Sequence, residues 1–330
     1  MSRVAITGGA GFLGSHIVRQ QKKKGNEVII VDNFSSGTVE NLEDLGVKQD
    51  CIVGDLRDSN FAKKALSKVD TVYHFAAEVG SVEYLHGTPH RELDALQANL
   101  VIDANVFKAC REIQANCIIY ASSVSVYPFG KQLGAHAIFR EEDATDHVDP
   151  EGGYGWSKFL GEVQLSMISG ISVGVARIFH AYGENIYMKP DRSQVIASLI
   201  SKSIHYPKDD FVVWGDGSQC RCFVFIDDVI DALEKLESYV RQKGKLTVNL
   251  GSQEEISVGE LAQQIVRISG KKIDLRFDAS RPSGAMSRIP DLERIKNTLG
   301  WMPKTKFQDG LTRTYNWAQR RLIADSTKLR

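Results

Sequence analysis

Tyr154 and Lys158 stand four residues apart in the segment Tyr-Gly-Trp-Ser-Lys, where a helix is predicted to begin. That spacing places the two side chains on one helix face. An ammonium group beside a phenol favours the phenolate and lowers a phenol pKa that is ordinarily about 10. A phenolate available near neutral pH could take the proton of a hydroxyl while a hydride leaves the same carbon. Tyr–Lys pairs are also common on helix surfaces without any chemical role, so other residues have to support this interpretation.

A run of serines supplies a partner for this pair. Ser122, Ser123 and Ser125 follow the short apolar segment 117–121, which is predicted to be a buried strand. A hydroxyl at the end of such a strand faces the crevice of a doubly wound sheet, where it can hydrogen-bond the reacting oxygen.

Three glycines, Gly8, Gly11 and Gly14, follow the predicted strand 4–7. Their spacing is a variant of the dinucleotide-binding fingerprint: the first allows a tight turn, the second admits a diphosphate, and the third lets helix and strand pack closely. The helix that follows would point its free N–H groups at the diphosphate.

Asp32 ends the next predicted strand, about 20 residues further on, where a carboxylate would bind the adenosine ribose and repel a 2′-phosphate. Asp55 follows the third strand and could accept a hydrogen bond from the adenine amine. The predicted cofactor is therefore NAD rather than NADP. The residues assigned to the cofactor are Gly8, Gly11, Phe12, Leu13, Gly14, Asp32, Asn33, Asp55, Leu56, Ala76, Asn99, Tyr154 and Lys158.

The elements that position these groups alternate between strand and helix. Short apolar runs predict strands at 4–7, 28–31, 51–53, 71–75, 117–121 and 171–178. Helical spacing between them predicts helices at 12–24, 58–68, 92–113 and 154–169. This alternation predicts an α/β fold, a Rossmann-type doubly wound parallel sheet with helices on both faces.

The rhythm changes after Phe179. The second half predicts helices at 193–205, 227–241, 258–269 and 308–322, and strands at 211–214 and 222–226. We expect an NAD-binding domain at 1–178 and a smaller α/β lobe at 179–330 that mainly binds substrate, with some segments able to rejoin the large sheet. The stretch from Pro128 to about Gly153 is expected to be irregular.

Composition excludes several classes of protein. The 330 residues carry 41 basic and 41 acidic side chains, so the chain lacks the basic surplus of a nucleic-acid binder. No apolar run reaches the ~20 residues of a membrane-spanning helix, and the N-terminus has no signal-peptide pattern. Five scattered cysteines indicate reduced thiols in a cytoplasmic protein. Cys220 and Cys222 have no second ligand pair at metal-site spacing, so no metal is expected.

The motifs together resemble those of the extended short-chain dehydrogenase/reductase family, in particular its nucleotide-sugar epimerases and dehydratases, over residues 3–320. The likeness rests on segments 7–14, 32–35, 54–58, 74–77, 120–123, 154–158 and 177–183. It implies that Tyr154 is the base, that Lys158 holds the nicotinamide ribose and that Ser123 assists the tyrosine. It also implies a nucleotide-diphosphate sugar as substrate and a homodimer.

The second half carries the residues that the resemblance assigns to substrate. Arg221 lies in the stretch from Trp214 to Phe223 that is expected to close over the diphosphate, and the planar fork of an arginine suits phosphate. The full set of expected substrate residues is His180, Arg192, Arg221, Arg281 and Arg288. His180 stands where the family usually has asparagine, and its charge is expected to titrate near pH 6.5.

Within the family the chain is most similar to the GDP-mannose 3,5-epimerases. These enzymes oxidise C4 and exchange protons at C3 and C5; their basic cysteine corresponds to Ser125 and their acidic lysine to Lys189. A serine without an activating neighbour is a poor base compared with a thiol, whose pKa is about 8.5. We therefore expect chemistry through a 4-keto sugar, with slow or absent exchange at C3 and C5. Glu78 is kept as a further acid–base candidate.

Other activities stay open. A UDP-sugar 4-epimerase uses the same three catalytic residues without an added base, and a nucleotide-sugar 4-dehydrogenase stops after oxidation. A 4,6-dehydratase is disfavoured because Val124 and Ser125 stand where it has an Asp-Glu pair. A non-catalytic NAD sensor would have no need of Tyr154 and Lys158.

Overall fold

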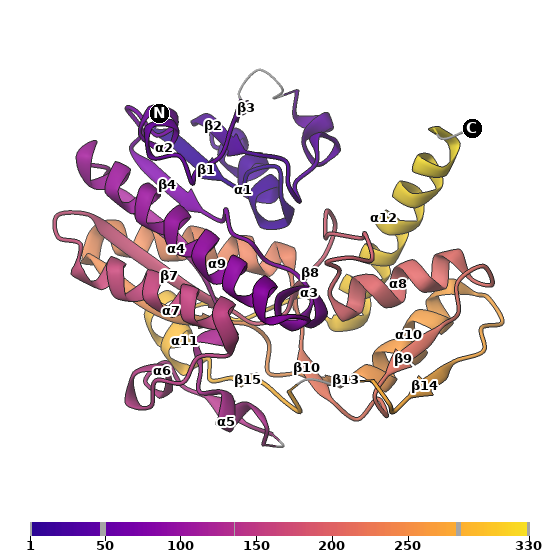
Figure 1. Cartoon of the computed structure of the whole chain (residues 1–330). Helices are drawn as coiled ribbons and strands as arrows, with labels where there is room; N and C mark the ends of the chain where they lie inside the picture. The colour runs from indigo at the N-terminus through magenta and orange to yellow at the C-terminus, as the bar shows by residue number, and fades with distance from the viewer. Residues whose placement is uncertain (1, 47–50, 135, 282–284, 329–330) are drawn as a thin grey trace.

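The computed structural model describes residues 2–46, 51–134, 136–281 and 285–328. Its centre is a seven-stranded parallel sheet in the order β12-β7-β5-β4-β1-β2-β3 (Figure 1). The strands of this sheet are β1 (Arg3–Thr7), β2 (Glu27–Asp32), β3 (Cys51–Val53), β4 (Thr71–His74), β5 (Cys117–Ser123), β7 (Ser172–Ile178) and β12 (Lys245–Leu250).

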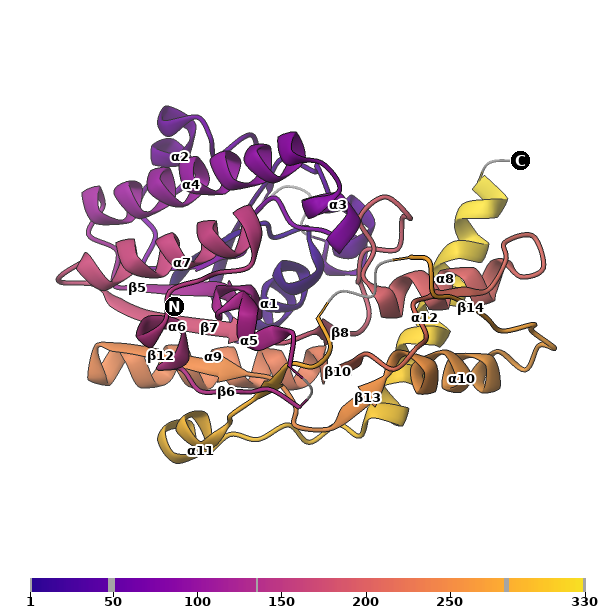
Figure 2. The same ribbon diagram turned by 60° about the horizontal axis from the view of Figure 1, so that its bottom comes forward.

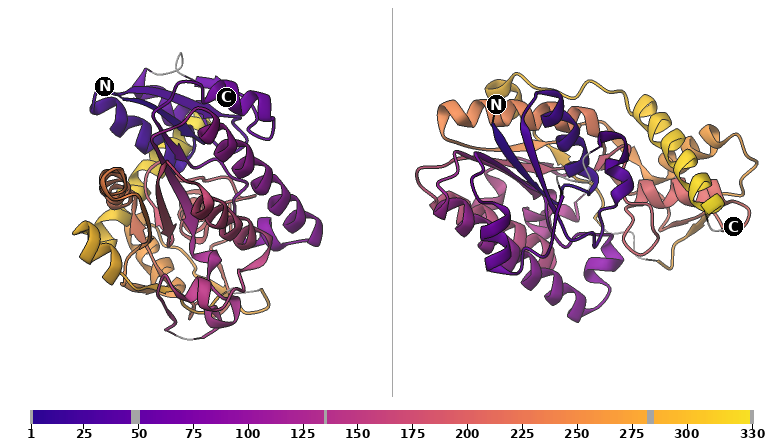
Figure 3. Two further views of the ribbon diagram at one scale, coloured as in Figure 1. Left: turned by 90° about the vertical axis from the view of Figure 1, so that its left-hand side faces the viewer. Right: turned by 90° about the horizontal axis from the view of Figure 1, so that it is seen from above.

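Helices cover both faces of the sheet. One face carries α2 (Ser59–Ala65), α4 (Pro89–Glu112) and α7 (Gly152–Met167), and the other carries α1 (Phe12–Lys23) and α9 (Ile226–Lys243). Figure 3 shows the magenta helices and the orange helix α9 on opposite sides. The strand period of two explains the division: Val4 and Ile6 belong to the core under α1 and α9, whereas Ala5 belongs to the core under α2 and α4. The predicted doubly wound fold is confirmed.

The seventh strand, β12, was not predicted. It pairs in parallel with β7 and brings residues from the second half of the chain into the large sheet. Its first three residues are partly exposed and only its last three are buried, so its sequence lacks the continuous apolar run that marks the other strands. The expected division at residues 178 and 179 stays a prediction.

The smaller lobe gathers on one side of the sheet (Figure 2). It contains α8 (Val195–His205), β9 (Val212–Trp214), β10 (Cys220–Cys222), β13 (Glu255–Ser257), α10 (Val258–Ser269), β14 (Arg276–Asp278) and α12 (Phe307–Lys328).

The single strand predicted at 222–226 is wrong. β10 pairs with β13, whereas β11 (Val224–Phe225) pairs with β8 (Ala181–Tyr182), and α9 begins directly afterwards. The chain changes partner at Phe223, whose ring stacks on that of Phe307 with centroids 5.4 Å apart. An apolar run does not reveal such a change of partner.

The irregular stretch before α7 contains three short elements. They are α5 (Phe129–Gln132), β6 (Ile138–Phe139) and α6 (Asp143–Asp146). β6 pairs with β15 (Ile289–Pro290), which is followed by α11 (Glu293–Leu299). This pairing brings a C-terminal segment back beside the beginning of α7. Among the described residues, no helix combines the length and apolar character needed to cross a bilayer.

Candidate active site

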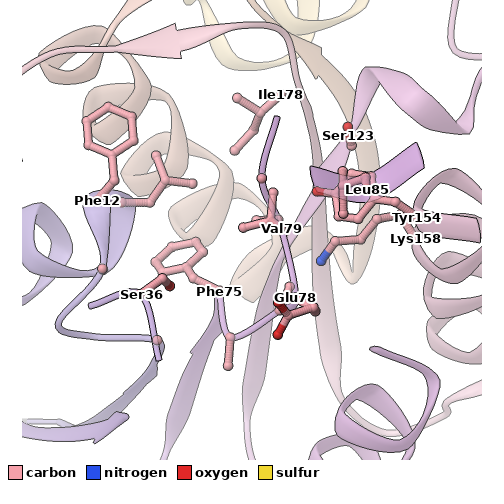
Figure 4. Close-up of a pocket in the computed structure, with 18 of the residues that line it drawn as sticks. Phe12, Ser36, Phe75, Glu78, Val79, Leu85, Ser123, Tyr154, Lys158 and Ile178 are labelled. Atoms are coloured by element: carbon pink, nitrogen blue, oxygen red, sulfur yellow. The ribbon is translucent and has the colours of Figure 1, made fainter. Parts of the chain in front are cut away.

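A cavity of about 460 Å³ lies at the carboxyl ends of β1, β2, β4 and β5, which is where ligands bind in open α/β sheets. Figure 4 shows Phe12 and Ser36 on one side of it and Ser123, Tyr154 and Lys158 on the other. The cavity therefore connects the glycine loop with the predicted catalytic residues.

The glycine loop has the geometry that a dinucleotide requires. Gly8 has φ +66°, and a Cβ there would lie 2.8 Å from the Ala76 backbone nitrogen. A Cβ on Gly14 would lie 2.1 Å from the Gly8 carbonyl oxygen, so helix and strand touch at this point. Gly11 caps α1 without any side-chain hydrogen bond, and the first turn has no acidic residue. The free N–H groups and the positive helix end thus suit a diphosphate in the cavity.

Asp32 lies across from this loop at the end of β2. Its carboxylate accepts hydrogen bonds from the backbone nitrogens of Ala10 (2.9 Å) and Phe34 (2.7 Å), and only 8% of the residue is exposed. Burial raises the pKa of Asp32, and the backbone hydrogen bonds oppose that shift. Asp32 and Asn33 both line the cavity, as expected for ribose contacts.

The remaining residues assigned to the cofactor differ in whether they line the cavity. Asp55 and Leu56 line the cavity, and Arg57 binds the Asp55 carboxylate at 2.5 Å and lowers its pKa. Ala76 also lines the cavity. Asn99 does not: it is buried and bonds the backbone nitrogen of Glu78 at 2.6 Å and the carbonyl oxygen at 3.0 Å. Asn99 therefore shapes the loop that carries Glu78.

Tyr154, Ser123 and Lys158 come together at the far end of the cavity. The Tyr154 side chain is hydrogen-bonded to that of Ser123, and this bond favours the phenolate. Burial nevertheless raises the pKa of Tyr154 to about 12. The predicted lowering by Lys158 is not found. The Lys158 ammonium lies 4.6 Å from the centre of the Tyr120 ring, and burial lowers its own pKa.

Sequence reasoning missed a buried carboxylate beneath this group. Asp103 of α4 is 1% exposed; it accepts a hydrogen bond from the Tyr120 hydroxyl at 2.7 Å and lies 2.9 Å from His74 Nε2. Its charge favours the Lys158 ammonium and disfavours the Tyr154 phenolate. The residues are far apart in sequence, so no spacing pattern could have revealed them.

The substrate side of the cavity is lined by Ser125, His180, Arg221 and Arg288. Burial, followed by the charge of Arg288, lowers the pKa of Arg221 to about 10. Burial and the two arginines also hold the pKa of His180 well below its ordinary value of 6.5. The expected titration of His180 near pH 6.5 is therefore wrong, because its surroundings penalise the imidazolium. Glu151, to which sequence reasoning assigned no role, also lines this side.

Three residues that the sequence assigned to catalysis or to substrate binding do not line the cavity. Lys189 is exposed and Arg281 lies 5.2 Å from the Trp214 ring; neither lines the cavity. Arg192 forms an ion pair with Glu78 at 3.0 Å and does not reach the cavity itself. Glu78 does line it, with its carboxylate also bound by the Tyr84 hydroxyl.

Residues 4–251 match the model of the NAD dependent epimerase/dehydratase family. A GDP-mannose 3,5-epimerase of rice (Oryza sativa) is 31% identical over 99% of this chain and 84% of its own length. A UDP-N-acetyl-alpha-D-glucosaminuronate decarboxylase of Bacillus cytotoxicus is 29% identical over 96% of this chain and 97% of its own length.

Solved structures extend the likeness to three dimensions. A UDP-N-acetylglucosamine 4-epimerase of Methanobrevibacter ruminantium, in complex with UDP-N-acetylmuramic acid, has a TM-score of 0.84 and 25% identity, over 98% of this chain and 99% of that one. A UDP-glucose 4-epimerase of Thermus thermophilus, in complex with NAD, has a TM-score of 0.80 and 23% identity, over 96% and 99% of the two chains.

Proposed function

The chain belongs to the NAD-dependent epimerase/dehydratase family and uses NAD, and on that premise we propose that it epimerises a nucleotide-diphosphate sugar through a 4-keto intermediate. Its relatives include nucleotide-sugar epimerases and decarboxylases. GDP-mannose is the first substrate to test, because the rice relative is a GDP-mannose 3,5-epimerase.

One observation carries the proposal: the hydrogen-bonded pair Ser123–Tyr154 and the Lys158 ammonium share a cavity with the glycine loop. NAD, held by the glycine loop and Asp32, would supply the hydride acceptor for C4. Tyr154 takes the proton of the 4-hydroxyl, and Ser123 hydrogen-bonds the reacting oxygen. The Asp103 charge favours the ammonium form of Lys158, the group that the family resemblance assigns to the nicotinamide ribose.

The positive charge of two arginines in the cavity lining suits a diphosphate. Arg221 and Arg288 line the cavity, and an arginine fork binds phosphate oxygens bidentately. His180 lines the same cavity, and a neutral imidazole can still donate one hydrogen bond.

A UDP-sugar 4-epimerase is the second candidate. It needs no second proton donor, and the position of Lys189, exposed and outside the cavity lining, favours it. The solved 4-epimerase of Methanobrevibacter ruminantium shares the whole length of the fold.

The test is incubation with GDP-mannose, UDP-glucose, UDP-glucuronate and dTDP-glucose in heavy water, with products identified by NMR. Deuterium at C3 or C5 indicates proton exchange beside the ketone, and inversion at C4 without deuterium indicates a 4-epimerase. Absence of NADH absorbance in a single turnover with every sugar would overturn the proposal. We also infer a cytoplasmic homodimer, supported by the resemblance; light scattering tests the dimer and fractionation of the source cells tests the location.

A further inference from the structure

The sequence suggested that Ser125 has no activating neighbour, but the structure shows that it has one. Its hydroxyl donates a hydrogen bond to Glu151 Oε2 at 3.1 Å, and both residues line the cavity. The expected poor exchange at C3 and C5 rested on a serine without an activating neighbour. The structure places a carboxylate at that point, so the reason for the expectation is removed.

The Glu151 carboxylate is held in a defined orientation. Arg288 donates to the other oxygen, Oε1, at 2.6 Å, and the two side chains are 13% and 9% exposed. The Glu151 backbone nitrogen also donates to the Ser125 carbonyl oxygen at 2.8 Å. Arg288 and Ser125 thus each bind one of the two carboxylate oxygens.

Glu151 and Tyr154 both line the cavity and lie on the same segment. Glu151 is the N-cap of α7, three residues before Tyr154, and Ser125 lies two residues after Ser123. Two side-chain hydrogen bonds, Ser123–Tyr154 and Ser125–Glu151, therefore connect the same two segments side by side. A sugar whose 4-oxygen lies at Tyr154 would have its neighbouring ring carbons close to Glu151.

We propose that Glu151, oriented by Arg288 and Ser125, is the base that removes the proton from a carbon next to the C4 ketone. This inference rests on the proposed function, which supplies the ketone.

The step balances without any further reactant. The C–H bond breaks, its proton goes to Glu151, and its electron pair forms the carbon–carbon double bond of the enolate, whose charge lies on the 4-oxygen. Tyr154, which is converted from phenolate to phenol when it takes up the 4-hydroxyl proton during C4 oxidation, donates a hydrogen bond to that oxygen. A glutamate carboxylate is a competent base for a carbon acid beside a carbonyl, as in triosephosphate isomerase.

The alternative is that Glu151 only neutralises Arg288. Both roles predict damage on mutation, so the test compares two rates in the same protein: hydride transfer at C4, followed by NADH absorbance in a single turnover, and deuterium wash-in at C3 and C5. The substrate is whichever of GDP-mannose, UDP-glucose, UDP-glucuronate and dTDP-glucose the wild-type protein oxidises fastest.

Glu151→Gln keeps the size of the side chain, removes its charge and basicity, and replaces one of its two acceptor oxygens with an NH2 donor. The ratio of wash-in to hydride transfer should fall by roughly 10²–10⁴, the usual range for a positioned base. Glu151→Asp should restore part of that ratio, and Ser125→Ala should lower it only about 2- to 12-fold, as expected for the loss of one hydrogen bond. The matched control is Glu92→Gln, because Glu92 Oε1 accepts from the Gly153 nitrogen at 2.8 Å without lining the cavity. Its ratio should stay within about threefold.

The outcomes separate the two levels of the proposal. If the wild type transfers hydride without any wash-in, or if Glu151→Gln and Glu151→Asp keep the wild-type ratio, the base assignment is wrong and the 4-keto chemistry stands. A ratio that falls equally in Glu92→Gln would assign the effect to the packing of α7 and would also overturn it. If no sugar yields NADH, the proposed function itself fails.

Discussion

The cofactor side and the substrate side of the cavity are built in different ways. On the cofactor side, the glycine backbone at Gly8 and Gly14 and the Asp32 carboxylate, which the Ala10 backbone nitrogen binds, all lie within one strand–helix–strand unit. On the substrate side, Ser125 and Glu151 are 26 residues apart, and Glu151 and Arg288 are 137 residues apart. The first side depends on local conformation, whereas the second depends on side chains that only the complete fold brings together.

The largest expected effect lies where the two sides meet. Tyr154→Phe should slow C4 oxidation by roughly 10²–10⁴, because the group that takes the hydroxyl proton is lost. Binding of NAD should change little, since Asp32 and the glycine loop are untouched. Single-turnover NADH absorbance and equilibrium titration of NAD measure the two effects. Near-normal oxidation would mean that the Ser123–Tyr154 pair is only structural.

Asp32→Ala tests the cofactor side of the cavity separately from the substrate side. Loss of carboxylate hydrogen bonds to the ribose should weaken NAD binding by roughly 10- to 150-fold, which corresponds to about 1.5–3 kcal/mol for hydrogen bonds to a charged group. NADP should be affected less, because the charge that repels its 2′-phosphate is removed. Titration of both cofactors decides, and an unchanged preference for NAD would contradict the ribose assignment.

On the substrate side, the burial of His180 should make the folding stability depend on pH. In the unfolded chain its pKa is about 6.5, whereas burial and the neighbouring arginines hold the folded value well below that. The unfolded state therefore binds more protons as pH falls below 6.5, and folding stability is lost there. His180→Asn should reduce this slope by at most about 1.4 kcal/mol per pH unit. Asparagine suits the backbone, because His180 has φ +37°.

Denaturant unfolding of His180→Asn and the wild type between about pH 7.5 and 5 measures this difference. If the free energy of unfolding depends on pH equally in both proteins, the folded protein accepts a proton on His180 as readily as the unfolded chain does.

Lys189→Ala should have the smallest effect. The side chain is exposed and lies outside the cavity lining, so turnover should fall by no more than about twofold, and stability should change by no more than about 0.5 kcal/mol, as is typical of surface substitutions. Steady-state kinetics on the substrate identified in the panel gives the answer. A loss of tenfold or more would show that the loop carrying Lys189 closes over the sugar.

The same contrast explains what could be predicted. Buried β-branched runs and the Gly8–Gly14 spacing are local signals, and they located six strands of the sheet and the cofactor loop. The Ser123–Tyr154 pair was predicted because each residue belongs to a short motif. Glu151 lies in the irregular stretch before α7, and its role depends on Ser125 and on Arg288, which β15 carries back to it. No sequence spacing encodes that contact.

The late strand β12 has a consequence for dissecting the protein. Residues 1–178 hold the glycine loop and Tyr154, yet β7 takes its outer neighbour from residues 245–250. A fragment ending at 178 would expose the full edge of β7 and the apolar surface that α9 covers, and such an edge is a template for pairing between chains. The fragment should therefore aggregate instead of binding NAD as an independent unit. Truncation at the expected boundary after residue 178 should not yield a folded cofactor-binding domain.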